Sequence, residues 1–223
     1  MLFRSSLAFG TAPDLEAVSI TGIDKVSPAD IAFAAELGYR LKLLGVARRT
    51  ASGIEQRVHP AMVPTRTPLA DVVSSFNAVA ADAGEAGPYF FQGRGAGQAP
   101  TASAVVADIV DVARGAFGPA FGRPAAELAK PKRAPAEART SAYYLRFQVL
   151  DVPGVMAEIS RHLANEAVSI ESMIQRGRAP GEQVAIVMIT HDAPHVAVER
   201  ALKAIAGSDK VSEAPCMIPM EAA

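Results

Sequence analysis

Residues 93–101 are Gly93-Arg94-Gly95-Ala96-Gly97-Gln98-Ala99-Pro100-Thr101, placed between the apolar run Tyr89-Phe90-Phe91 and a helical pattern over 101–114. Glycines permit a sharp turn and close approach of the backbone to another surface, and a helix start leaves N–H groups free for an anion. The segment therefore predicts a strand, a tight loop and a helix N-terminus. From spacing alone it is equally compatible with a turn that serves only packing.

This glycine loop does not match the dinucleotide-binding fingerprint G-x-G-x-x-G. Counting from Gly93 gives G-x-G-x-G-Q, and counting from Gly95 gives G-x-G-x-A-P. No acidic residue ends a following strand about 20 residues on, as that fingerprint requires. The loop is therefore expected to form at most one side of a nucleotide site whose main part lies elsewhere.

Composition limits the class of protein. The chain has 223 residues, of which 50% are hydrophobic and 20% charged, which is enough to bury a core in one large or two ordinary domains. A net charge of −1 offers no basic field for nucleic acid or anionic membrane. Cys216 is the only cysteine, which excludes internal disulfides, and no apolar run has the roughly 18 to 20 residues needed to span a bilayer. We expect a cytoplasmic protein.

The sequence offers no support for a metal site or for covalent catalysis. Of the histidines, His59, His162, His191 and His195, only the last two are four residues apart, and Pro194 interrupts a helix between them. No serine or Cys216 lies in a nucleophile elbow. We therefore expect neither a metal site nor a covalent nucleophile.

The first third of the chain carries clear helix signals. Residues 1–10 resemble the last turns of a helix closed by Gly10 at the C′ position. Ser27-Pro28-Ala29-Asp30 combines an N-cap serine, a proline at the first helical position and an acidic residue three on, which predicts a helix over 28–37. Gly38 is expected to end it.

Two strands are predicted next. Residues 39–47 are largely apolar and residues 54–59 alternate strictly, with a turn at 51–53, so they predict an antiparallel pair with one wet face. Glu55 and Arg57 are expected on that solvated face. Prolines are expected to break up the stretch that follows, before a short helix over 69–72: Pro60, Pro64 and Pro68.

A further strand pair, 76–81 and 88–92, leads into the glycine loop. The helix beyond the loop has one apolar face, made by Ala102, Val105, Val106, Ile109 and Ala113. Residues 115–141 are rich in alanine, proline and basic residues without amphipathic period, which predicts an interdomain linker. The predicted domains are therefore 1–114 and 142–223, joined by the linker 115–141.

The last 80 residues predict a ferredoxin-like βαββαβ domain. The expected order is a strand over 143–149, a helix over 155–163, strands over 168–176 and 184–190 with a turn at Ala179-Pro180-Gly181, a helix over 194–206 and a strand over 211–220. Tyr143, Tyr144 and Met156 are expected in a core or interface. The fold class is α+β, with mixed or antiparallel sheets and helices preceding the ferredoxin-like domain.

Asp151-Val152-Pro153-Gly154 joins the first strand and helix of that domain. Proline fixes the turn, glycine allows close backbone approach, and the helix N-terminus favours a carboxylate. Asp151, Pro153 and Gly154 are therefore candidates for binding a regulatory ligand. The alternative is a tight turn in which Asp151 caps the helix.

Several motifs together resemble the catalytic and dimerisation part of bacterial homoserine dehydrogenase. They are Leu7-Ala8-Phe9-Gly10, residues 18–22, Asp30-Ile31-Ala32, Leu37-Gly38-Tyr39, Lys42-Leu43-Leu44, Arg57-Val58-His59-Pro60, and the glycine loop continuing to Ala104. Residues 143–220 resemble the ACT domain that many of these enzymes carry. The resemblance covers nearly all the chain except the linker.

The resemblance implies reversible reduction of L-aspartate 4-semialdehyde to L-homoserine with NADPH or NADH, on the route to threonine, methionine and isoleucine. It implies that Gly95, Ala96 and Gly97 border the cofactor, which in that family is bound mostly by an N-terminal Rossmann domain. It further implies a homodimer or homotetramer, and threonine as an effector at the ACT domain.

The chain departs from the family pattern at its start. In that family the Rossmann domain, and the acidic residues and lysine that bind substrate and move the proton, precede the segment that Leu7–Gly10 resembles, so these catalytic residues are expected upstream of Met1. By alignment the lysine would fall just before Met1, and Met1-Leu2-Phe3-Arg4 differs from the helix sequence that the family has there. No catalytic residue is therefore assigned within the chain.

From this departure we expect a truncated or mispredicted start at Met1, and no turnover by this chain alone. The alternative is a threonine-sensing regulatory or oligomerisation module without catalysis.

Overall fold

The computed structural model describes residues 2–116, 118–135, 139–175 and 181–221. The chain forms two compact units, one from residues 1–15 and 63–131 and the other from residues 16–62 and 132–222. Each unit thus joins segments that are far apart in the sequence. The mixture of helices with antiparallel and mixed sheets confirms the predicted α+β class.

The first unit contains the glycine loop. Its helix α1 (Leu2–Phe9) ends at Gly10, which has φ of 66° as the predicted C′ position requires. The strands β4 (Phe76–Asp82) and β5 (Pro88–Arg94) form an antiparallel hairpin, and α3 (Gln98–Ala113) follows the loop. A 3₁₀ turn, η2 (Pro68–Asp71), replaces the short helix expected at 69–72.

The start of the chain is described only from Leu2 onward. Met1, at which we expected a truncated or mispredicted start, lies outside the described residues. The helix expected over the first ten residues is therefore confirmed for Leu2–Phe9 alone. The expectation about the start itself stays a prediction.

The predicted apolar face of α3 is present but exposed. No residue of α3 is buried in the described part of the first unit, and Ile109 is 61% exposed. The hairpin likewise exposes aromatic side chains, with Phe91 at 62%. These elements offer apolar surface to a partner.

In the second unit, a three-stranded sheet has the order β1 (Val18–Ile20), β3 (Gly53–Pro64), β2 (Tyr39–Thr50), and β1 pairs with β3 in parallel. Helix α2 (Pro28–Glu36) precedes β2 and has the predicted capping box between Ser27 and Asp30. The expected break at Pro60 was wrong, since β3 runs through it to Pro64. The fixed φ of proline fits an extended backbone at this position.

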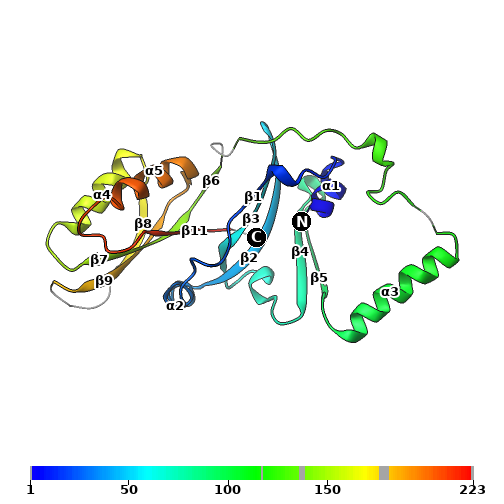
Figure 1. Cartoon of the computed structure of the whole chain (residues 1–223), viewed down its shortest axis with the longest axis horizontal. Helices are drawn as coiled ribbons and strands as arrows, with labels where there is room; N and C mark the ends of the chain where they lie inside the picture. Colours follow the sequence, from blue (N-terminus) through cyan, green and yellow to red (C-terminus); the bar gives the residue numbers. More distant parts are fainter. Residues whose placement is uncertain (1, 117, 136–138, 176–180, 222–223) are drawn as a thin grey trace. The chain divides into compact units, whose positions relative to one another are not determined.

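The ferredoxin-like prediction is confirmed for the ACT-like part of the second unit (Figure 1). Its elements are β7 (Tyr143–Leu150), α4 (Val155–Asn165), β8 (Ile170–Gln175), β9 (Gln183–Thr190), α5 (His195–Ile205) and β11 (Cys216–Pro219). The sheet order is β11-β7-β9-β8 with every pair antiparallel. The end of the predicted strand at Arg176 and the turn residues Ala179 and Pro180 lie outside the described residues.

Both faces of this four-stranded sheet are covered. Helices α4 and α5 lie on one face (Figure 1), where Tyr143 and Phe147 belong to the main apolar core. On the other face, Tyr144 packs in a second core with Ala34 of α2 and Met62 of β3. Both tyrosines are therefore core residues, and Met156 packs against the main core.

The segment between the two family-like parts is mostly irregular, with one 3₁₀ turn, η4 (Ala125–Glu127). Isolated bridges tie Ala129 to Thr11 in the first unit and Arg133 to Ile54 in the second. A short strand, β6 (Thr140–Ser141), pairs with β10 (Ala193–Pro194). Among the described residues, no helix has the length and apolar character to cross a membrane.

Candidate functional site

The glycine loop is built by the end of the β4–β5 hairpin. Gly95 N–H donates to the Ser75 carbonyl at 2.9 Å, and the Arg94 guanidinium lies 5.1 Å from the centre of the Phe76 ring. Gly97 has φ of 118° and occupies the N-cap of α3, where no side chain caps the first turn. Main-chain N–H groups at this helix start are thus available to a ligand.

A hollow of about 290 Å³ adjoins the loop and is lined by Arg4, Asn77, Gln92, Arg94 and Gly95 among others. A Cβ at Gly95 would overlap the amide of Asn77, whereas a Cβ at Gly93 would meet nothing within 4 Å. The absence of a side chain at Gly95 therefore keeps the loop close to Asn77. Two of the residues that line the hollow, Arg4 and Arg94, are arginines, a side chain that can bind an anion such as phosphate.

The candidate regulatory turn holds its shape through the main chain. Asp151 N–H donates to the Glu182 carbonyl at 2.8 Å, and Gly181 N–H donates to the Asp151 carbonyl at 3.1 Å. Gly154, with φ of 91°, is the N-cap of α4, so Asp151 does not occupy that position. Pro153 lies between them and precedes the open helix start.

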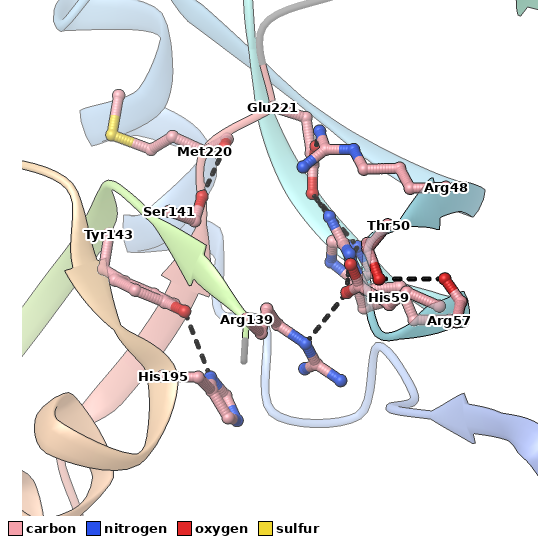
Figure 2. Close-up of polar contacts among 12 residues, drawn as sticks. Arg48, Thr50, Arg57, His59, Arg139, Ser141, Tyr143, His195, Met220 and Glu221 are labelled. Atoms are coloured by element: carbon pink, nitrogen blue, oxygen red, sulfur yellow. Dashed lines mark hydrogen bonds and ion pairs between the residues drawn. The ribbon is translucent and has the colours of Figure 1, made fainter. Parts of the chain in front are cut away.

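Glu55 and Arg57, expected on a solvated face, belong to a cluster of buried charges. Arg57 is 2% exposed, and it pairs with Glu55 and Glu221 rather than facing solvent. The expected wet face of β3 is wrong because Glu221, near the end of the chain, and Arg139, just before β6, pair with the charged side chains on that face. Arg139 donates from Nε to Glu55 at 3.1 Å (Figure 2).

Glu221 is the acceptor at the centre of the cluster. Its side chain is 4% exposed, and Arg48 Nη2 donates to its second oxygen at 2.7 Å. Arg57 approaches the first oxygen, and His59 Nε2 lies 3.5 Å from that same atom. The sequence around residue 221 does not predict that Glu221 binds these arginines, since they precede it by more than 160 residues.

His59 is held in its neutral form with a defined tautomer. Arg57 Nε donates to His59 Nε2 at 2.8 Å, which makes Nε2 an acceptor, so the proton on Nδ1 points to the Pro60 carbonyl at 3.0 Å. Burial lowers the pKa of His59, and the nearby Arg57 acts in the same direction. The signal for this site was the placement of residues 55, 57 and 59 on one face of an alternating strand.

A second buried charge, Asp30, connects α2 to the ACT-like sheet. Tyr144 Oη donates to Asp30 at 2.9 Å and Arg146 Nε donates at 2.7 Å. Burial alone would raise the pKa of Asp30, but hydrogen bonds from Arg146 and Ser27 outweigh it and hold the pKa below its usual value. Cys216 lies nearby, and burial raises the pKa of its thiol to about 11, which leaves it unreactive as a thiolate.

Comparisons with known proteins agree with this architecture. Residues 1–110 match the homoserine dehydrogenase family model, and residues 143–207 match the ACT domain. A crystal structure of a homoserine dehydrogenase from Thiobacillus denitrificans superposes with a TM-score of 0.88 at 40% identity, over 99% of this chain and 51% of that one. The chain belongs to the homoserine dehydrogenase family.

Curated homoserine dehydrogenases show the same relation. That of Neisseria gonorrhoeae is 43% identical over 97% of this chain, and that of Pseudomonas aeruginosa is 38% identical over 93%. The chain spans about half the length of these homoserine dehydrogenases, 51% and 50% respectively. The resemblance inferred from the motifs is confirmed, while the placement of the catalytic acidic residues and lysine upstream of Met1 stays a prediction.

Proposed function

We propose that this chain supplies the cofactor-facing loop and the regulatory domain of a homoserine dehydrogenase, which interconverts L-homoserine and L-aspartate 4-semialdehyde with NADP or NAD. The observation that carries the proposal is the fold shared with the Thiobacillus denitrificans enzyme over 99% of this chain at 40% identity. The nucleotide cofactor supplies the hydride chemistry when bound. The glycine loop of this chain helps to orient that cofactor.

Gly95, Ala96 and Gly97 are the proposed cofactor-facing residues. The uncapped start of α3 presents N–H groups, and the positive φ of Gly97 is a conformation that side chains rarely adopt. The main part of the cofactor site is proposed to lie in a Rossmann domain that these 223 residues do not include. We expect at most weak NADPH binding by the 223 residues alone.

A chimera tests the catalytic proposal. The half of the Neisseria gonorrhoeae enzyme that this chain does not match would be fused ahead of Met1, and NADP reduction measured with L-homoserine. We expect turnover by the chimera, none by the 223 residues alone, and a loss of at least tenfold on Gly97→Val. Gly93→Ala, which introduces its Cβ into open space, is the matched control. A folded chimera without turnover would refute the proposal.

The second candidate function is amino-acid sensing at the ACT domain, favoured by the open helix start behind Gly154. We propose Asp151, Pro153 and Gly154 as effector contacts and threonine as the effector. Calorimetric titration with threonine, methionine and isoleucine tests it, with Asp151→Ala as the variant and the exposed Asp192→Ala as the control. Absence of heat with all three amino acids contradicts the sensing role.

A further inference from the structure

In the second unit, two arginines bind the carboxylate of Glu221, and no part of the proposed function uses this interaction. Both oxygens of Glu221 are engaged by arginines from different strands, Arg48 of β2 and Arg57 of β3. Glu221 and Arg57 are almost fully buried, whereas the Arg48 side chain is 46% exposed. Charges buried this deeply are retained in proteins when they are paired.

The main chain beside Glu221 is fixed as well. Glu221 N–H donates to the Met62 carbonyl at 2.9 Å, and Met220 forms a parallel bridge with Met62 of β3. Ser141 Oγ donates to the Met220 carbonyl at 2.8 Å (Figure 2). Met220 and Glu221, which we call the tail, therefore extend β11 onto β3.

The chain enters the ACT-like sheet at the same place. Arg139, just before β6, pairs with Glu55 of β3, and Glu55 also pairs with Arg57. The first and last segments of the ACT-like part thus end in one network on β3. A shift of that part relative to β3 would break both connections together.

We infer that the tail is an intramolecular latch: Arg48 and Arg57 are a receptor for the Glu221 carboxylate, and the latch couples the ACT-like sheet to β3. Removing the Glu221 charge takes away the carboxylate that pairs with Arg48 and one of the two that pair with Arg57. The tail and β3 therefore both become less stable. This inference is independent of any cofactor or effector and goes beyond the proposed function.

Hydrogen exchange of the whole chain, read by mass spectrometry, tests the latch. We expect Glu221→Gln to speed exchange at least tenfold in peptides covering 216–221 and, less strongly, in those covering 56–63. Arg48→Gln, at the half-exposed partner, gives the same pattern with smaller amplitude and serves if Glu221→Gln fails to fold. The double variant should show less than the sum of the two effects, because both remove one interaction.

Glu213→Gln is the matched control, since Glu213 lies in the same C-terminal segment with an exposed side chain. Its exchange should equal that of the unsubstituted chain. Unchanged exchange at 216–221 in Glu221→Gln, or additive effects in the double variant, would overturn the latch. Faster exchange in the tail with none at 56–63 would overturn the coupling to β3.

Discussion

Arg57 shows how a single residue's role can depend on chain far away. Strict alternation over 54–59 predicted a half-solvated strand, and the strand itself is confirmed. The side chain is nevertheless buried, because Glu221 pairs with it and Arg139 pairs with the neighbouring Glu55, and both partners come from segments more than 80 residues later. Spacing places Glu55, Arg57 and His59 on one face of the strand, but local periodicity cannot report that Glu221 covers this face.

His59 should make the second unit sensitive to mild acid. Burial lowers its folded pKa below the unfolded value of 6.5, so the unfolded chain binds more protons between the two values. Its contribution is therefore complete above pH 6.5 and is lost as pH falls through the folded pKa. The facing groups are Arg57, Glu221 and Arg139, and protonation would also remove the acceptor of Arg57 Nε.

Denaturant unfolding at pH 8, 7, 6 and 5 measures this effect. A single histidine accounts for at most about 1.4 kcal/mol per pH unit. We expect His59→Gln to flatten the slope below pH 6.5, with a remainder from His195, whose pKa burial also lowers. The exposed His191→Gln is the control. An unaltered slope in His59→Gln contradicts the assignment.

Asp30 should be a strong determinant of stability. Asp30→Asn leaves Arg146 with a neutral partner in a buried setting, and removal of one member of such a pair costs about 3 kcal/mol. Thermal and urea unfolding measure the loss. Asp24→Asn, at an exposed position before the same helix, should change stability by less than about 0.5 kcal/mol. Equal effects of the two substitutions would argue against the buried pair.

At the scale of elements, prediction succeeded where the signal is local. The capping box at Ser27 fixed the start of α2, and alternation over 143–149 located β7. It failed where a strand is paired with a distant segment, as in β3 beyond Pro60, where Met62 bridges Met220. The glycine loop was located between β5 and α3, and the structure adds Asn77 as the group that a Cβ at Gly95 would displace.

The junction between β5 and α3 should depend on Gly97. With φ of 118°, an alanine there is strained by about 1–3 kcal/mol. We expect Gly97→Ala to speed hydrogen exchange in the first two turns of α3. Gly93→Ala, whose Cβ meets no atom within 4 Å, should leave exchange unchanged. A tolerated Gly97→Ala would mean that the positive φ is not required.

At the scale of the molecule, the exposed apolar side chains of the hairpin and α3 favour self-association. Phe91 and Ile109 are each more than 60% exposed, and extensive exposed apolar surface often marks a site of protein–protein contact. We expect sedimentation velocity to show a dimer or tetramer, with Phe91→Ser weakening association at least tenfold. Ile23→Ser, at an exposed apolar residue of the second unit, should not. A monomer at all concentrations would contradict this expectation.

The division of the chain into units also bears on how it is made. Met62 cannot form its bridge to Met220 until about 160 further residues have been synthesised, which takes roughly 8 to 32 seconds at typical translation rates. Throughout that interval Arg57 has only Glu55 as its acidic partner, and Arg48 and Arg57 both lack the carboxylate of Glu221. Completion of the second unit is therefore a late event of synthesis, since β3 gains its last partner segment and Glu221 its arginines only when the tail is made.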